Sequence, residues 1–247
     1  MSAQLRAELF KLRSTRTGLG LFGALIGLVV LAVVLHSLLP AETLAGRKHQ
    51  LTVFGRGEFL GVLFAALLGS LSITSEIRHG TIRPTFLVTP RRGRVIAVKA
   101  AASGLAGATF GLVAGAVGVG AGVAALGARG IDIRLDGGDD ILLVAGSAAA
   151  GALWAAIGVG VGAVIRHQVP TVVGICAWLL FVEGLLVGDL VGLGDIFKFL
   201  PGSAAAAISG QEPGTLLPPA VGLAVLAIYA AATAGAGAFA TLHRDVG

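Results

Sequence analysis

The sequence predicts a single all-α integral membrane domain that covers residues 1–247 and crosses the bilayer six times. Two features of its composition favour this class: 55% of the residues are hydrophobic and only 13% are charged, and the mean hydropathy is +0.92. Soluble domains carry about 25% charged residues, so the chain lies far outside their range. The third feature is a series of uncharged runs long enough to cross a hydrocarbon core of about 30 Å as helices.

Residues 1–17 precede the first of these runs and are expected to form an interfacial helix. Leu5, Leu9 and Leu12 recur at helical spacing, and basic side chains between them can reach lipid headgroups. A basic leader that only fixes the orientation of the chain is the simpler alternative, and the two interpretations are compatible. Residues 18–39 then form an uncharged run that is the first predicted span.

The second predicted span, residues 59–75, is at the lower limit of length for crossing a bilayer. A polar link separates it from the first span. The last charged residues of this link, Arg56 and Glu58, are interpreted as boundary charges at the outer end of the second span.

The segment after the second span, residues 76–99, is predicted to be a cytosolic loop. It contains six basic residues against the single acid Glu76, and such a segment cannot lie in hydrocarbon. A short helix can form over residues 75–79 and end at Gly80, and Thr89–Pro90 is a typical start for the next helix. A basic loop placed only by membrane topology is the alternative, but it does not account for these helix boundaries.

The third predicted span, residues 100–128, is longer than one perpendicular crossing requires, so we expect it to be tilted or to extend beyond the bilayer. Glycines recur along it at steps of three or four residues and therefore share one face. These are Gly104, Gly107, Gly111, Gly115, Gly118 and Gly122. Small residues let membrane helices approach closely, so the face is interpreted as a packing surface within the bundle or against a second subunit. A permeation groove is the alternative.

An acidic connection over residues 129–140 leads to the fourth and fifth predicted spans, residues 141–165 and 169–188. Glu183 is the one ionisable residue well inside a predicted span. Acids inside membranes are costly and face a cavity or a partner group. Two roles for Glu183 stay open: a part in a substrate path or gate, and a structural hydrogen bond near the outer interface.

The link over residues 189–215 is long and half apolar, and two short helical pieces that dip into the membrane interface would explain it. A loose surface loop is the alternative. Residues 216–242 form the sixth predicted span, and six spans place both termini on the same side. That side carries twice as many lysines and arginines as the other, so both termini are predicted to be cytoplasmic.

The sequence gives no sign of enzymatic chemistry. None of its lysines follows a glycine, so a G-x-x-x-x-G-K-[ST] phosphate-binding loop is absent, and no serine lies in a G-x-S-x-G context. The five histidines are scattered without metal-ligand spacing. The net charge of +5 follows the expected topology and does not indicate nucleic acid. Any nucleotide chemistry is expected to reside in another polypeptide.

Three parts of the chain resemble the ABC-2 family of transporter permeases, which are membrane subunits of bacterial exporters. They are AELFKLRSTR immediately before the first span, ITSEIRHGTIRPTFLVTPRRGRVIAVK after the second, and a long half-apolar link before the sixth. The resemblance covers essentially the full chain, and the second motif is its specific part.

The resemblance implies a membrane-surface helix at the N-terminus and re-entrant helices between the fifth and sixth spans on the outer side. It also implies a cytosolic coupling helix that docks on a separate ATPase, formed here by Glu76, Ile77, Arg78, His79, Gly80 and Thr81. Members of this family combine two membrane subunits, identical or related, with two ATPase subunits in the bacterial inner membrane. ATP and Mg²⁺ are then expected in the ATPase, and no cofactor in this chain.

A membrane protein that uses no ATP is the competing class, either an ion-coupled carrier or an anchor for a regulatory partner. A carrier should have broken helices and charges near the middle of the bilayer, and only Glu183 is a candidate for such a charge. The transported substrate has no motif in the sequence. A drug, an antibiotic, a lipid and a peptide are all compatible with so few polar groups.

Overall fold

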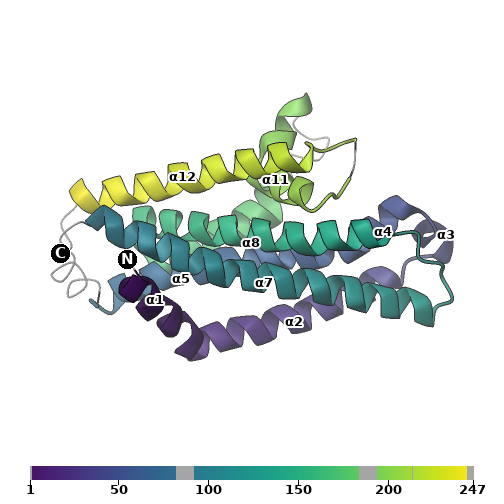
Figure 1. Cartoon of the computed structure of the whole chain (residues 1–247), viewed down its shortest axis with the longest axis horizontal. Coiled ribbons are helices and arrows are strands. Elements are labelled where there is room, and N and C mark those ends of the chain that lie inside the picture. Colours follow the sequence, from purple (N-terminus) through teal and green to yellow (C-terminus); the bar gives the residue numbers. More distant parts are fainter. Residues whose placement is uncertain (1, 82–91, 184–193, 213, 244–247) are drawn as a thin grey trace.

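The computed structural model describes residues 2–81, 92–183, 194–212 and 214–243. Within these ranges the protein is all-helical and contains no β-strand, which confirms the predicted all-α class. Five of the described helices are long and apolar enough to cross a membrane. The long helices run along a common direction and form an elongated bundle (Figure 1).

The chain begins with two helices, α1 (Ser2–Ser14) and α2 (Arg16–Ser37). Thr15 separates them, because its backbone is extended and its side chain accepts a hydrogen bond of 3.3 Å from the N–H of Gly18. This contact caps the first turn of α2. The break lies close to the predicted boundary between residues 1–17 and 18–39.

The next helices are α3 (Ala41–Leu44), α4 (Arg47–Phe54) and α5 (Arg56–Arg78). The predicted second span, residues 59–75, is only the middle of α5. Together α4 and α5 give a 32-residue stretch, far above the lower limit for crossing a bilayer. Residues 75–78 continue α5 without a break, so the separate short helix predicted there is wrong, although α5 does end just before Gly80.

Glu58 is not an exposed boundary charge. It lies in the first turn of α5, its exposed fraction is 4%, and its Oε2 accepts a hydrogen bond of 2.9 Å from Nε2 of Gln211. The two residues are more than 150 positions apart in the chain. Only the folding of the C-terminal half onto α5 buries this carboxylate.

The helix α7 (Arg92–Ala128) has 37 residues and begins well before the predicted third span, residues 100–128. The predicted loop over residues 76–99 is therefore too long at both ends. Lys99 belongs to α7 and not to the loop, and it is fully buried. The predicted helix start at Thr89–Pro90 lies outside the described residues.

The helix α8 (Gly137–Ile165) begins with a capping box, in which the side chains of Asp136 and Asp139 each accept a hydrogen bond from the other's backbone N–H. This cap extends the helix four residues beyond the predicted fourth span, residues 141–165. Arg166 ends α8 in the left-handed region, with φ of 64°, and donates a hydrogen bond of 3.0 Å to the carbonyl of Ala240.

The C-terminal third contains α9 (Gln168–Ala177), the π-helical turn η1 (Trp178–Val182), the 3₁₀ helix η2 (Gly194–Phe199), α11 (Pro201–Ile208) and α12 (Pro219–His243). The stretch from Gln168 to Val182 is apolar but shorter than the five membrane-length helices. The predicted end of the fifth span, residues 184–188, and the first part of the link over residues 189–215 lie outside the described residues. The link contains two short helices, η2 and α11, and α12 corresponds to the predicted sixth span, residues 216–242.

The helices α5 and α8 form the centre of the bundle. More than half of their most apolar segments is buried inside the protein, against about a fifth for α2 and α12 at the periphery. Side chains of α5 and α8 contribute to all three apolar clusters of the core. The first cluster also contains α2 and α7, and the second contains η1, α11 and α12.

The glycines of the predicted stripe lie on the face of α7 that contacts its neighbours. A Cβ added at Gly107 or Gly111 would overlap backbone atoms of α8, and one added at Gly118 would overlap backbone atoms of α4 and α5. Gly104 and Gly115 also face α8, and Gly122 lies against the ring of Phe54. The stripe therefore packs within the same chain, first against α8 and then against α4 and α5.

Different helix ends lie at the two ends of the bundle. The start of α1, the end of α5, the start of α7 and the end of α12 all lie at one end (Figure 1). The helices α3 and α4 lie at the other end (Figure 1). The described ends of the chain therefore lie at the same end of the bundle.

The variants Gly111→Leu and Gly120→Leu test the packing surface. At Gly111 a side chain meets the backbone of Ser147 on α8, whereas the exposed Gly120 of the same helix has nothing within 4 Å. Overpacking commonly costs about 1–3 kcal/mol, and here backbone atoms must move. We expect Gly111→Leu to lower the thermal unfolding temperature of the purified protein and Gly120→Leu to leave it unchanged. Equal effects would contradict the assignment.

Candidate functional site

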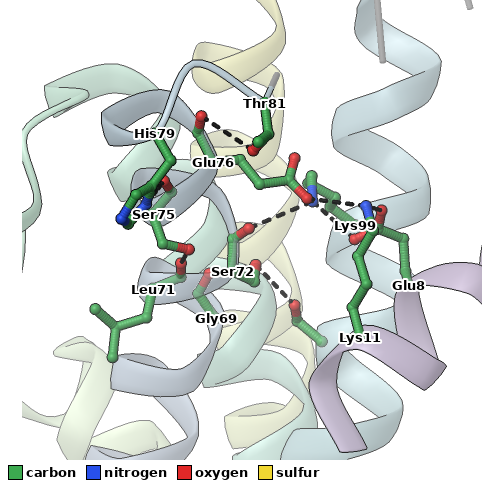
Figure 2. Close-up of polar contacts among 11 residues, drawn as sticks. Glu8, Lys11, Gly69, Leu71, Ser72, Ser75, Glu76, His79, Thr81 and Lys99 are labelled. Atoms are coloured by element: carbon green, nitrogen blue, oxygen red, sulfur yellow. Dashed lines mark hydrogen bonds and ion pairs between the residues drawn. The ribbon is translucent and has the colours of Figure 1, made fainter. Parts of the chain in front are cut away.

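Four charged side chains from three helices meet where α5 ends and α7 begins (Figure 2). We call this group the ion cluster, and it consists of Glu8, Lys11, Glu76 and Lys99. Nζ of Lys99 lies 2.7 Å from Oε2 of Glu8 and 2.8 Å from Oε1 of Glu76. Nζ of Lys11 lies 2.9 Å from Oε1 of Glu8 and 3.0 Å from Oε1 of Glu76. Each carboxylate therefore contacts both ammonium groups.

Helical spacing places these side chains. Glu8 and Lys11 are one turn apart on α1, and Ser72 and Glu76 are one turn apart on α5, so each pair shares a helix face. The early start of α7 brings Lys99 to the same level as these two turns. Lys99 also donates a hydrogen bond of 3.3 Å to the carbonyl of Ser72.

Charge balance explains why the cluster can be buried. The side chain of Lys99 is 1% exposed, and burying an ammonium group is costly unless it is paired. Glu8 and Glu76 supply two negative charges, and Lys11, whose side chain is half exposed, supplies the second positive charge. The cluster is therefore formally neutral, with Lys99 at its buried centre.

The pKa values of the two α1 residues follow from this arrangement. Burial acts to raise the pKa of the Glu8 carboxyl, but the charges and hydrogen bonds of Lys99 and Lys11 outweigh it and bring the pKa below its ordinary value. Burial acts to lower the pKa of Lys11, and the hydrogen bonds and charges of Glu8 and Glu76 bring it above its ordinary value. Both groups are held in their charged forms.

The six residues of the predicted coupling segment divide into two groups. Glu76 and Ile77 turn inwards: Glu76 joins the ion cluster, and Ile77 packs against the apolar cluster that contains Ile73 and Ile96. Oε2 of Glu76 is buried and has no hydrogen-bond partner within the described part of the chain.

The other four residues, Arg78, His79, Gly80 and Thr81, are exposed at the end of α5 and define the exposed turn. Gly80 has φ of 69°, a left-handed conformation that ends the helix and that residues with a Cβ rarely adopt. Nη1 of Arg78 donates a hydrogen bond of 3.3 Å to Oε1 of Gln168 at the start of α9. The exposed turn thus contacts α9, and the residues immediately before it contact α1 and α7.

A cavity of about 490 Å³ lies beside the ion cluster and extends under the exposed turn. Its polar wall includes Glu8, Lys11, Glu76, Arg78 and His79. No group of three or more metal-ligating side chains occurs in the described residues. The chemistry available here is therefore ion pairing and hydrogen bonding, which fix three helix ends relative to one another.

The remaining predicted site residue, Glu183, lies near the first turn of α5, whereas the ion cluster lies at the last turn of this helix. Its carboxylate accepts hydrogen bonds from Nε1 of Trp178 at 2.6 Å, from the N–H of Gly202 at 2.8 Å and from the N–H of Ser203 at 3.2 Å. Gly202 and Ser203 lie in the first turn of α11, whose own first residues provide no side-chain cap. Glu183 therefore caps a helix that follows it in the chain.

Sequence patterns do not reveal that Lys99, Glu8 and Lys11 belong to this site. Lys99 is one of several basic residues near the predicted loop, and Lys11 is expected at lipid headgroups. One signal was present: Glu8 is the only acid of the N-terminal segment, and Glu76 is the only acid of the predicted loop. Isolated acids among basic residues are candidates for ion pairs, but their partners depend on the fold.

Comparison of the sequence with protein-family models and with curated protein sequences gives no match. Over the described residues, the fold defines an all-α protein with five helices of membrane-spanning length and composition.

The variants Lys99→Met and Lys11→Met test the ion cluster. Loss of Lys99 leaves two buried carboxylates without their central cation, and breaking a buried ion pair in this way costs about 3–5 kcal/mol. Loss of the half-exposed Lys11 should cost about 1 kcal/mol or less. Thermal unfolding of the two purified variants in the same detergent measures the difference. A similar decrease for both would show that Lys99 is not the centre of the cluster.

The variant Glu8→Gln tests the charge on Glu8. Because the folded state lowers its pKa below the ordinary value of 4.5, its stabilising contribution is complete above that pH and is lost as the pH falls through the lowered value. The difference in unfolding temperature between wild type and Glu8→Gln should therefore be largest at neutral pH and shrink in acid. The exposed acid Glu42 provides the control as Glu42→Gln, and a difference for Glu8→Gln that is constant with pH would refute this role.

Proposed function

We propose that this chain is the membrane-spanning permease subunit of an ATP-driven exporter of the ABC-2 type. The observation that carries the proposal is the position of the exposed turn, residues 78–81. It begins two residues after Glu76, which is ion-paired to both α1 and α7. A soluble partner that binds this turn can displace the end of the central helix α5. The ion cluster then transmits the movement to α1 and α7.

In this proposal a separate ATPase subunit, present in two copies, docks on the exposed turn and holds ATP and Mg²⁺. A second permease subunit, identical or related, completes the assembly, and closure of the ATPase dimer drives alternating access. Arg78 and His79 provide the polar contacts with the ATPase, and Glu76 acts within the permease. Ile77 anchors the turn in the core, and Gly80 and Thr81 shape it.

The proposed membrane arrangement has six crossings in the bacterial inner membrane, with both termini cytoplasmic. The stretch formed by α9 and η1 is the fifth crossing, and α1 lies at the cytoplasmic interface. The short helices η2 and α11 are the re-entrant pieces on the outer side. The clustering of the described chain ends at one end of the bundle, opposite α3 and α4, supports this arrangement (Figure 1).

An ATP-independent carrier is the second candidate, and one observation favours it. Two acids, Glu58 and Glu183, are buried near the π-helical turn η1 that follows α9, and carriers use irregular helices with intramembrane charges. An anchor for a regulatory partner would need neither feature. Glu58 lies in the first turn of α5 and Glu183 is bonded to the first turn of α11, and these positions at helix ends favour the exporter.

Co-purification of ATPase activity tests the proposed function. The tagged chain, extracted from its native membrane in mild detergent, should carry Mg²⁺-dependent ATPase activity. The double variant Arg78→Ala with His79→Ala should retain about a tenth of that activity or less per permease, since the contacts of a docking turn commonly sum to more than 1.4 kcal/mol. The variant Lys48→Ala, an exposed basic residue at the other end of the bundle, is the control. A wild-type permease without associated ATPase activity would support the carrier.

A further inference from the structure

A second cavity, of about 370 Å³, lies at the end of the bundle opposite the ion cluster. It is enclosed by α4, α5, η1, α11 and the residues that follow α11. Two buried acids line it: Glu58, which is 4% exposed, and Glu183, which is 6% exposed. We call this cavity the outer cavity.

The two carboxylates differ in how their charges are satisfied. Glu183 accepts hydrogen bonds from an indole N–H and from two backbone N–H groups of α11. Glu58 accepts a single hydrogen bond, from the amide of Gln211 to its Oε2. Its Oε1 has no donor within the described part of the chain, so Glu58 presents an unpartnered carboxylate oxygen in the outer cavity.

No described lysine, arginine or histidine lies within ion-pair distance of these two acids, Glu58 and Glu183. Arg56 also lines the outer cavity, but its Nη2 lies 2.7 Å from Nε2 of His36. Residues 184–193 lie outside the described structure, and their sequence contains no lysine, arginine or histidine.

The walls of the outer cavity define what kind of cation fits. They are largely apolar and include Phe59, Val62, Leu179, Phe197 and Leu216. Ca²⁺ and Mg²⁺ take six or more oxygen ligands and Zn²⁺ takes about four ligands, and the described residues hold no cluster suited to a metal. Apolar and aromatic walls around a carboxylate are suited to an organic cation, whose charge also interacts favourably with aromatic faces. A volume of this size is typical of sites for small organic molecules.

We propose that the outer cavity binds a small organic cation, a protonated amine that donates a hydrogen bond to Oε1 of Glu58. The apolar part of the amine lies against Phe59 and Phe197. Glu183 adds negative charge to the site while its own oxygens remain bonded to α11. Binding requires only this chain, so the test below does not depend on the proposed ATPase partner.

Calorimetric titration of the full-length purified chain with benzylammonium tests this site, and benzyl alcohol is the neutral probe of the same shape. We expect saturable binding of benzylammonium at neutral pH and at least about tenfold weaker binding of benzyl alcohol, because a hydrogen bond between charged groups is lost. The variant Glu58→Gln should weaken benzylammonium binding by at least about tenfold. The variant Glu42→Gln, at the same end of the bundle but exposed, should bind as wild type.

A second variant keeps Glu58 and introduces a lysine side chain into the outer cavity. Thr52 lines the outer cavity, so Thr52→Lys supplies an ammonium group to Glu58, which should abolish benzylammonium binding and raise the unfolding temperature. Thr43→Lys, which adds the same charge outside the cavity, is the control. Equal affinity for the two probes, no binding of either, or unchanged binding by Glu58→Gln would overturn the proposal. No binding of either probe would indicate that a proton is the only occupant of the site. Unchanged binding by Glu58→Gln would indicate that benzylammonium binds elsewhere.

Discussion

Burial of the Lys99 ammonium group is the constraint on which the packing of α1, α5 and α7 at the ion cluster depends. A single lysine on α7 requires negative charge from outside its own helix, and Glu8 on α1 and Glu76 on α5 provide it. Movement of α7 away from the other two helices would leave Lys99 without either partner in a nearly water-free site. A short N-terminal helix, which propensity alone would hardly hold in place, is thereby fixed to the two helices that flank the exposed turn.

Close backbone contact among α5, α7 and α8 complements this ion pairing. Gly107, Gly111 and Gly151 allow α7 and α8 to touch backbone to backbone, and Gly57 and Gly118 do the same for α5 and α7. A displacement of one of these helices is transmitted to its neighbours through such contacts, because protein interiors are close-packed and hardly compressible. The polar end and the glycine-packed middle of the bundle therefore behave as one mechanical unit, which the proposed coupling to an ATPase requires.

The all-α class, the positions of the main apolar helices and the packing role of the glycine face follow from composition and periodicity. The pairing of Lys99 and the burial of Glu58 do not. A prediction from a short stretch of sequence treats each charge as the boundary of a span. Lys99 can nevertheless lie inside α7, because it is paired with Glu8, which is adjacent in space although more than 90 positions away in the chain. Glu58 is likewise covered by Gln211. Charges that are neutralised by distant residues escape any local rule.

The length of α5 between its two acids has a consequence for the surrounding lipid. Glu58 and Glu76 are 18 positions apart on this continuous helix, which corresponds to about 27 Å at 1.5 Å per residue. The hydrocarbon core of a typical bilayer is about 30 Å thick. In the proposed membrane arrangement this helix carries one acid near each face of the bilayer, so the spacing of the two polar sites matches the thickness of the hydrocarbon core. Hydrophobic mismatch would act directly on both sites, and the lipid composition of the membrane would then affect how the ends of α5 are packed.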